Sequence, residues 1–224
     1  RFVDQDIAPL VAEAEESEVF PRELFRKWGE LGLLGVRYPE ADGGTGFDKV
    51  SDCIVREEMS RVCQAFASSW SAHTHLAIWP IWRAGTETQK ERFFKPGLSG
   101  GKVGGFGLSE PDGGSDVRSM KTRAEKVEGG YRLNGAKYWI TNSPICDLAV
   151  VWAKLDDKIR GFIIERGMDG FTTDKIDGKL SLRASITGDI GLNDVMVPEE
   201  NLLPGVSGLR GPFSCLNKAR YGIA

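Results

Sequence analysis

Hydrophobic positions in the first hundred residues repeat with a helical period. Residues 24–31 carry apolar side chains on one helix face, at Leu24, Phe25, Trp28 and Leu31, between Pro21 as a start and Gly35 as a stop. Residues 49–63 predict a second helix, with apolar positions at Val50, Ile54, Val55 and Met59. Residues 66–79 predict a third, which we expect to end near Pro80, and Thr86 is a typical N-cap for a short helix that follows.

The pattern changes at Gly100-Gly101 to short runs in which apolar and polar residues alternate, as they do in half-buried strands. We predict strands over 122–127, 131–133, 136–141, 148–154, 160–164 and 189–197. Gly129-Gly130, Asn134-Gly135 and Asp156-Asp157 are the expected hairpin turns. The expected fold is α+β: an N-terminal helical domain (1–100), an antiparallel β-barrel-like middle domain (101–208) and the start of a C-terminal helical domain (209–224).

Composition and charge argue against several classes of protein. The 224 residues include 29 basic and 32 acidic side chains, which excludes a strongly basic nucleic-acid surface. No apolar run approaches the roughly 20 residues of a membrane span. The four cysteines and two histidines lack the spacing of metal ligands, so we expect no metal site and buried free thiols in a reducing compartment. The chain stops within a helix-compatible run, and we expect the protein to continue beyond Ala224.

The segment from Phe106 to Asp116 is the first candidate for ligand binding. An apolar run ends at Leu108 and is followed by Ser109, a proline and the adjacent glycines Gly113 and Gly114. Glycines allow a backbone to approach a ligand closely, and successive N–H groups in such a loop can point at phosphate oxygens. An ordinary Pro-Asp-Gly turn after a strand is the alternative interpretation.

The second candidate is Tyr138 to Asn142. Trp139 and Thr141 are two residues apart, so in a strand both side chains point to the same face. An indole beside a hydroxyl can pack on a planar heteroaromatic ring and donate a hydrogen bond to its edge. A tryptophan that fills the core of the β domain is the alternative.

The two candidates together, in this order, resemble the middle domain of the acyl-CoA dehydrogenase family. Leu180–Gly188, Val197–Gly205 and Asn217–Ala224 also resemble later segments of that family, closest to its glutaryl-CoA dehydrogenase branch. The resemblance implies FAD as cofactor, with Thr141 near flavin N5 and Trp139 against the ring. The implied FAD-binding residues are Phe106, Gly107, Leu108, Ser109, Gly114, Ser115, Trp139, Ile140 and Thr141.

The resemblance also implies an activity and partners. It predicts α,β-dehydrogenation of an acyl-CoA thioester to a trans-2-enoyl-CoA, with electrons passed to an electron-transfer flavoprotein. A homotetramer or homodimer is implied, in the cytoplasm of a bacterium or the mitochondrial matrix of a eukaryote. An acyl-CoA oxidase or flavin monooxygenase on the same fold is one alternative, and a truncated non-catalytic binding protein is another.

Two positions depart from the family pattern. One branch places its catalytic glutamate at the position of Ala219, so the base is expected beyond Ala224 and no catalytic residue is named. The arginine that anchors the distal carboxylate in glutaryl-CoA dehydrogenases falls on Ala67, which favours an uncharged acyl group. His73 or His75 is a candidate for a replacing polar contact, although packed histidines are more common. The implied substrate-binding residues are Ala67, Ser68, Ser115, Phe213, Leu216, Asn217 and Arg220.

Overall fold

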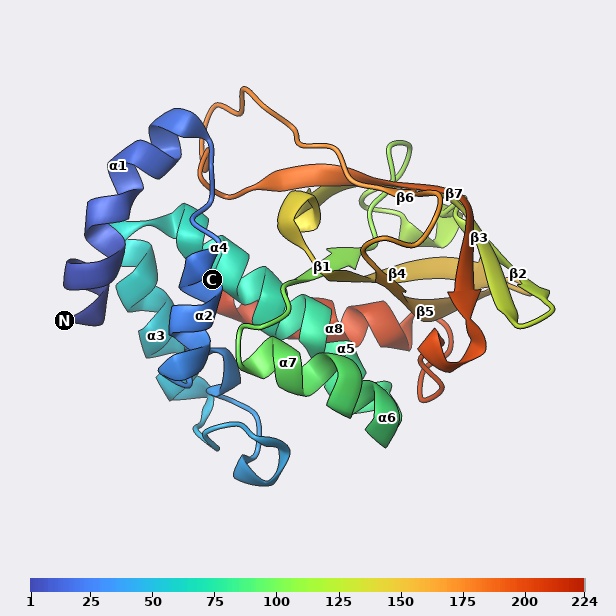
Figure 1. Cartoon of the computed structure of the whole chain (residues 1–224), viewed down its shortest axis with the longest axis horizontal. Helices are drawn as coiled ribbons and strands as arrows, with labels where there is room; N and C mark the ends of the chain where they lie inside the picture. The colour runs from blue at the N-terminus through green and yellow to red at the C-terminus, as the bar shows by residue number, and fades with distance from the viewer. Residues whose placement is uncertain (224) are drawn as a thin grey trace.

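Helices occupy the first part of the chain in the computed structural model, which describes residues 1–223, so that Ala224 lies outside the described residues. The α-helices are α1 (Ala8–Ser17), α2 (Glu23–Glu30), α3 (Lys49–Val62), α4 (Gln64–Ser71), α5 (Ile78–Ala84), α6 (Glu87–Gln89) and α7 (Lys95–Leu98). Two π-helical segments, Val3–Ile7 and Lys90–Phe94, adjoin α1 and α7, and a third, Ala72–Ala77, joins α4 to α5. These helices form an N-terminal helical region, which lies next to the sheet (Figure 1).

Several helix ends differ from the prediction. Helix α2 stops at Glu30 because Gly32 takes a left-handed conformation, with φ of 71°. The predicted stop at Pro80 is wrong, since α5 continues to Ala84. Pro80 lies in the first turn of α5, directly after the π-helical segment, and a missing N–H is tolerated in a first turn. Thr86 caps α6 as predicted, in a reciprocal pair of hydrogen bonds with Gln89.

The sheet contains β1 (Gly104–Gly107), β2 (Arg123–Val127), β3 (Gly130–Thr141), β4 (Leu148–Leu155), β5 (Lys158–Glu165), β6 (Phe171–Thr172) and β7 (Thr187–Pro198). Its order is β1-β4-β2-β3-β7-β6, and β5 pairs with β4. The α+β class is confirmed, but the sheet is mixed, because β4 runs parallel to β1 and to β2. The turn at Asp156 and Asp157 joins β4 and β5 as predicted, with both residues at positive φ.

The predicted hairpin at Asn134-Gly135 is wrong, because β3 runs through it as one strand. Gly135 has φ of 146°, and the pairing of β3 with β7 shifts register between Leu133 and Gly135. A Cβ on Gly135 would lie 2.5 Å from Thr122 Oγ1. Gly135 therefore marks a β-bulge at which Thr122, just before β2, approaches the backbone closely. Glycine is common both in such bulges and in hairpin turns, so the residue type alone does not distinguish them.

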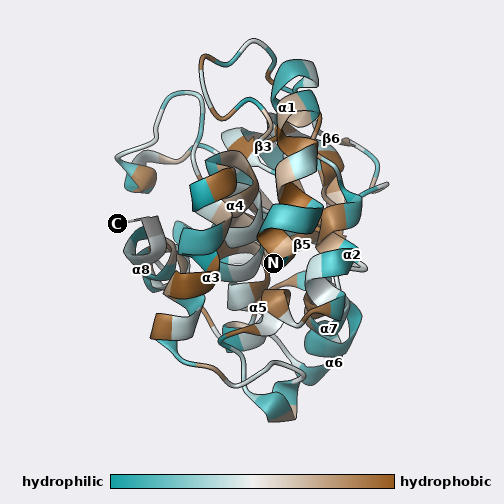
Figure 2. Ribbon diagram, turned by 90° about the vertical axis from the view of Figure 1, so that its left-hand side faces the viewer, coloured by the Kyte–Doolittle hydropathy of each residue, from teal (hydrophilic) through white to brown (hydrophobic). Residues whose placement is uncertain are grey.

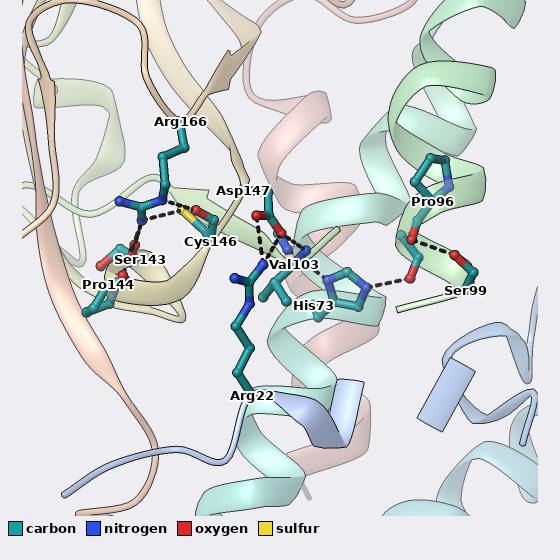
Figure 3. Close-up of polar contacts among 12 residues, drawn as sticks. Arg22, His73, Pro96, Ser99, Val103, Ser143, Pro144, Cys146, Asp147 and Arg166 are labelled. Atoms are coloured by element: carbon teal, nitrogen blue, oxygen red, sulfur yellow. Dashed lines mark hydrogen bonds and ion pairs between the residues drawn. The ribbon is translucent and has the colours of Figure 1, made fainter. Parts of the chain in front are cut away.

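Polar contacts join the helices to the sheet, and the one made by His73 is buried (Figure 3). His73, in the π-helical segment after α4, accepts the Gly104 N–H on Nδ1 at 2.9 Å, and its Nε2 lies 3.0 Å from the Gly97 carbonyl oxygen. Asp147 accepts the Val103 N–H at 2.7 Å and pairs with Arg22 at 2.6 Å. The start of β1 is therefore held by groups from three separate parts of the chain.

The last helix, α8 (Arg210–Ile223), returns to the helical domain and lies along α5 and the π-helical segment before it (Figure 1). Two apolar positions of the α3 pattern, Val50 and Ile54, are 63% and 55% exposed. Helix α3 lies on the side of the molecule that faces the viewer in Figure 2. Across the described residues, none of the helices has the length and apolar character to cross a membrane. The four cysteines are free, and Cys63, Cys146 and Cys215 are buried.

Candidate functional site

A cavity of about 390 Å³ lies where the end of β1, the end of β3, the π-helical segment and α8 meet. It brings together residues that are far apart in the sequence. Of the candidate cofactor and substrate residues, those on its wall are Phe106, Leu108, Ser109, Gly114, Ser115, Trp139, Ile140, Thr141, Phe213, Leu216 and Arg220. Ala72, Leu76 and Val117 complete the lining. We refer to this space as the main cavity.

A second β-bulge presents Trp139 and Thr141 to the main cavity. The pairing of β3 with β7 shifts register between Lys137 and Ile140, and Trp139 takes φ of 60°. Trp139 is 59% exposed, whereas Ile140 is 3% exposed. The simple alternation of a strand is therefore broken here, and three consecutive residues line the same cavity. The indole does not fill the core of the β domain, which removes that alternative interpretation.

Three hydroxyl groups on this wall have no partner among the residues that the structure describes. Within residues 1–223, the side chains of Ser109, Ser115 and Thr141 make no hydrogen bond. Gly114 has open space around the position of a Cβ, with no heavy atom within 4 Å. Hydroxyls that a protein leaves unpaired beside an exposed aromatic ring are suited to a planar ligand with polar edges.

A buried ion pair fixes the loop that follows β1, and sequence patterns alone did not single it out. Glu110 Oε1 lies 2.8 Å from Lys137 Nζ, and it accepts the Thr122 hydroxyl at 2.6 Å. Although burial opposes ionisation, these bonds and one from the Lys121 N–H hold the pKa of Glu110 down, at about 2. The pair stands directly below the cavity wall, since Lys137 also donates to the Leu108 carbonyl oxygen.

A second cavity, of about 280 Å³, adjoins the main cavity through shared residues, which are Ala72, Leu76 and Thr141. We refer to it as the side cavity. Its wall is rich in small polar residues, namely Ser68, Ser71, Ser181, Ser185 and Thr187, and it also includes Leu182 and Ala219. Two cations, Arg56 and Lys179, line it, and none of the described residues on its wall is acidic. Arg56 is a residue that sequence reasoning missed, because nothing in α3 distinguishes it from a surface arginine.

Four candidate residues lie away from the main cavity. Gly107 is buried in β1, and a Cβ there would lie 3.2 Å from Lys137 Cγ and from Val151 Cγ2, so this glycine keeps space inside the sheet. Asn217 is exposed on the outer side of α8. Ser68 lines the side cavity. Ala67 lines neither cavity: it is fully buried in the core of the helical domain, in one cluster with Phe20, Phe66 and Trp70.

The two histidines have structural partners and line neither cavity. His73 joins the helical domain to β1, as described above, and burial lowers its pKa to about 4. His75 lies 3.0 Å from the Asp52 carboxylate through Nε2 and 3.1 Å from Ser71 Oγ through Nδ1. The idea that one of them contacts an acyl group directly is therefore wrong for these positions, and the packed alternative is correct.

Comparison with known proteins finds enzymes with similar sequences and similar folds. The family model "Acyl-CoA dehydrogenase, N-terminal domain" matches residues 1–101, and "Acyl-CoA dehydrogenase, middle domain" matches residues 105–195. The mitochondrial isovaleryl-CoA dehydrogenase of Arabidopsis thaliana is 42% identical over 210 residues, which cover 91% of this chain and 51% of that protein. The short-chain specific acyl-CoA dehydrogenase of Clostridium acetobutylicum is 37% identical, over all of this chain and 60% of its own length.

Solved structures agree in fold with these relatives. A glutaryl-CoA dehydrogenase from Mycobacterium smegmatis, in complex with FADH2, superposes with a TM-score of 0.96 at 41% identity. The superposition covers 99% of this chain and 57% of that one, so the chain spans about half the length of the relatives it matches. Two family models over most of the chain, a shared fold and relatives above 40% identity lead to one conclusion: the chain belongs to the acyl-CoA dehydrogenase family.

Proposed function

We propose that this protein catalyses the FAD-dependent α,β-dehydrogenation of an acyl-CoA thioester. The observation that carries the proposal is the main cavity, where the loop after β1, the bulged end of β3 and α8 supply an exposed indole and unpaired hydroxyls to one space. Relatives from isovaleryl-CoA to short-chain acyl-CoA dehydrogenases support this reaction class. An M. smegmatis relative described in complex with FADH2 supports the cofactor.

The wall of the main cavity fits a flavin. Trp139 offers an aromatic face, Thr141 and Ser109 offer hydroxyls for the polar edge of the ring, and Gly114 leaves room for a close backbone approach. Bound FAD would supply the hydride acceptor of the reaction. The residues of this chain would bind and orient the two reactants, and Thr141, which lines both cavities, is the residue we propose to contact both of them.

The proposal also includes a catalytic base, an electron acceptor, an oligomeric state and substrate contacts. Ala219 lines the side cavity and carries no acid–base group, so we place the catalytic base in residues beyond Ala224. An electron-transfer flavoprotein is the proposed acceptor, in line with a 37% identical chain in a structure described as the electron transferring flavoprotein of Acidaminococcus fermentans. We also propose a homo-oligomer, located in the mitochondrial matrix or the bacterial cytoplasm according to the organism. Arg220 and Phe213 on the cavity wall are proposed substrate contacts.

Thr141 allows a direct test. In the full-length protein, Thr141→Val removes the hydroxyl with little change of shape, and Thr141→Ser restores it. We expect Thr141→Val to slow reduction of the flavin by saturating acyl-CoA by roughly 10- to 100-fold, the size of one lost hydrogen bond to a charged or reacting group. Thr141→Ser should recover most of the rate, and Thr172→Val on the exposed strand β6 is the matched control.

The measurement is stopped-flow bleaching of the flavin absorbance, followed by mixing with air. A purified full-length protein without a flavin spectrum, or one whose flavin no acyl-CoA bleaches, would show that the proposed function is wrong. Rapid recovery of the absorbance in air would instead favour an acyl-CoA oxidase or a monooxygenase on this fold.

A further inference from the structure

Lys137 carries an ammonium group that is enclosed by the β-sheet. The residue is fully buried in β3, and its Nζ donates to Glu110 Oε1 at 2.8 Å and to the Leu108 carbonyl oxygen at 3.3 Å. Gly107 leaves room for its aliphatic stem, because a Cβ there would lie 3.2 Å from Lys137 Cγ. At pH 7 the group is protonated, although burial lowers its pKa to about 8. A positive charge therefore lies inside the sheet, in contact with the loop that follows β1.

Stability alone does not account for this ion pair. Removing two charges from water costs free energy, and a buried pair is often no more stabilising than two apolar side chains of the same volume. Glu110 does not depend on Lys137 alone, since it also accepts from the Thr122 N–H and hydroxyl, at 3.0 and 2.6 Å. Within residues 1–223, what Lys137 alone supplies is the donor to the Leu108 carbonyl oxygen.

This donor helps to join the two segments that form the wall of the main cavity. Lys137 donates to the Leu108 carbonyl oxygen, and the Tyr138 N–H donates to the Ser109 carbonyl oxygen at 2.9 Å. Two consecutive residues of β3 thus hold two consecutive carbonyls of the loop after β1, immediately before the bulge at Trp139. Leu108, Ser109 and Trp139 all line the main cavity. The loop and the bulge are therefore fixed relative to each other.

The peptide group between Leu108 and Ser109 carries the charge of the lysine toward the cavity side. Its carbonyl accepts from Lys137 inside the sheet, and in a trans peptide the N–H points in the opposite direction. Among the residues that the structure describes, the Ser109 N–H has no hydrogen-bond partner. A cation at the carbonyl polarises the peptide and strengthens the donor at its N–H. Lys137 therefore acts on a free donor of a residue that lines the main cavity.

We infer that Lys137 is a positioning residue for the flavin, which acts through the Leu108–Ser109 peptide to favour the reduced cofactor over the oxidised one. This inference rests on the proposed function and deepens it. Reduction adds electron density to the polar edge of the ring, and a polarised N–H donor binds the more negative form more tightly. Glu110 holds the lysine in place and offsets the cost of its burial.

The test uses the full-length protein with bound FAD and without acyl-CoA. One measurement is the affinity of the apoprotein for oxidised FAD, from the quenching of FAD fluorescence. The other is the reduction potential of the bound flavin, from a titration against a dye of known potential. Together they give the affinity for reduced FAD. A residue that only supports the fold changes both affinities by the same factor and leaves the potential unchanged, so the potential separates the two roles.

The main variant combines Lys137→Met with Glu110→Gln, so that neither charge is left buried and unpaired. We expect it to lose affinity for reduced FAD by roughly 10-fold more than for oxidised FAD, which lowers the reduction potential by about 30 mV for a two-electron couple. Glu110→Gln alone keeps the donor to Leu108 and should shift this ratio by less than about 3-fold. The matched control is Lys126→Met with Glu199→Gln, an exposed ion pair at β2, which should change neither quantity.

The outcomes separate this inference from the proposed function. If the full-length wild type binds no FAD, the proposed function fails and the inference with it. If FAD binds but the folded double variant of Lys137 and Glu110 keeps the wild-type potential, the inference is overturned while the dehydrogenase function stands. A shift of the same size in Glu110→Gln alone would also overturn it, because the effect would then belong to the carboxylate. Should the double variant not fold, Lys137→Gln with Glu110→Gln replaces the ion pair with two amides and is judged by the same potential.

Discussion

His73 predicts a specific dependence of stability on pH. Its ring is fully buried, with Nδ1 accepting from the Gly104 N–H and Nε2–H donating to the Gly97 carbonyl oxygen. Both nitrogens are therefore satisfied only in the neutral ring, and a second ring proton would face a donor. We expect the folded protein to resist protonation of His73, and His73→Gln to remove the resulting pH dependence.

The size of the effect follows from the shift in pKa. Burial lowers the pKa of His73 to about 4 from the usual 6.5. Between these values the unfolded chain binds more protons than the folded one, so stability falls as the pH falls. The difference corresponds to about 3 kcal/mol, fully retained above pH 6.5 and lost as the pH approaches 4. His73→Gln should cost about 1 kcal/mol at pH 7 through imperfect hydrogen bonds.

Urea unfolding at several pH values from 4 to 7.5 measures this directly. The free energy of unfolding should fall more steeply with acid in the wild type than in His73→Gln. His75→Gln is the matched control, since it removes the only other histidine and retains His73. Equal slopes for the wild type and His73→Gln would refute the reasoning, because they would mean that protonation of His73 does not oppose folding.

Two further predictions concern the packing of the backbone and the helical core. Gly135→Val should lower the free energy of unfolding by more than about 2 kcal/mol in urea, because φ is 146° and a Cβ would collide with Thr122. Gly178 also has positive φ but open space around it, so Gly178→Ala should cost less stability. An equal loss of stability in the two variants would contradict the collision with Thr122. Ala67→Arg should lower the free energy of unfolding by several kcal/mol, because it buries an unpaired charge in an apolar cluster. A stable Ala67→Arg protein with improved turnover of glutaryl-CoA would mean that position 67 reaches the acyl pocket after all.

Local patterns in the sequence were sufficient for much of the fold. Apolar periodicity placed the helices that contain Trp28 and Met59, and turn residues located the hairpin at Asp156-Asp157. These features depend on neighbours in the chain, which is why they can be predicted from it. The two-residue signal at Asn134-Gly135 failed because a hairpin glycine and a bulge glycine look alike until the partner strand is known.

Sequence motifs also identified the segments of the candidate site, but not which of their side chains reach it. The stretch Phe106–Ser115 and the residues Trp139 to Thr141 were singled out by residue type, order and family resemblance. Only the bulge at Trp139, with its positive φ, brings three consecutive side chains to one cavity. Gly107 and Asn217 belong to the same motifs and lie away from it.

The family, the α+β class and the segments that form the main cavity could be identified from the amino-acid sequence, because short stretches of contiguous residues encode them. The positive charge at the side cavity could be recognised only once the chain was folded, because it depends on which residues of distant elements meet there. The family resemblance implied that Ala67 lies in the substrate pocket, yet Ala67 faces the core, and Arg56 lines the side cavity from α3 with Ser71 as its partner. The reason is physical: a side chain's contacts depend on which face its helix buries, and that face is set by elements distant in the chain.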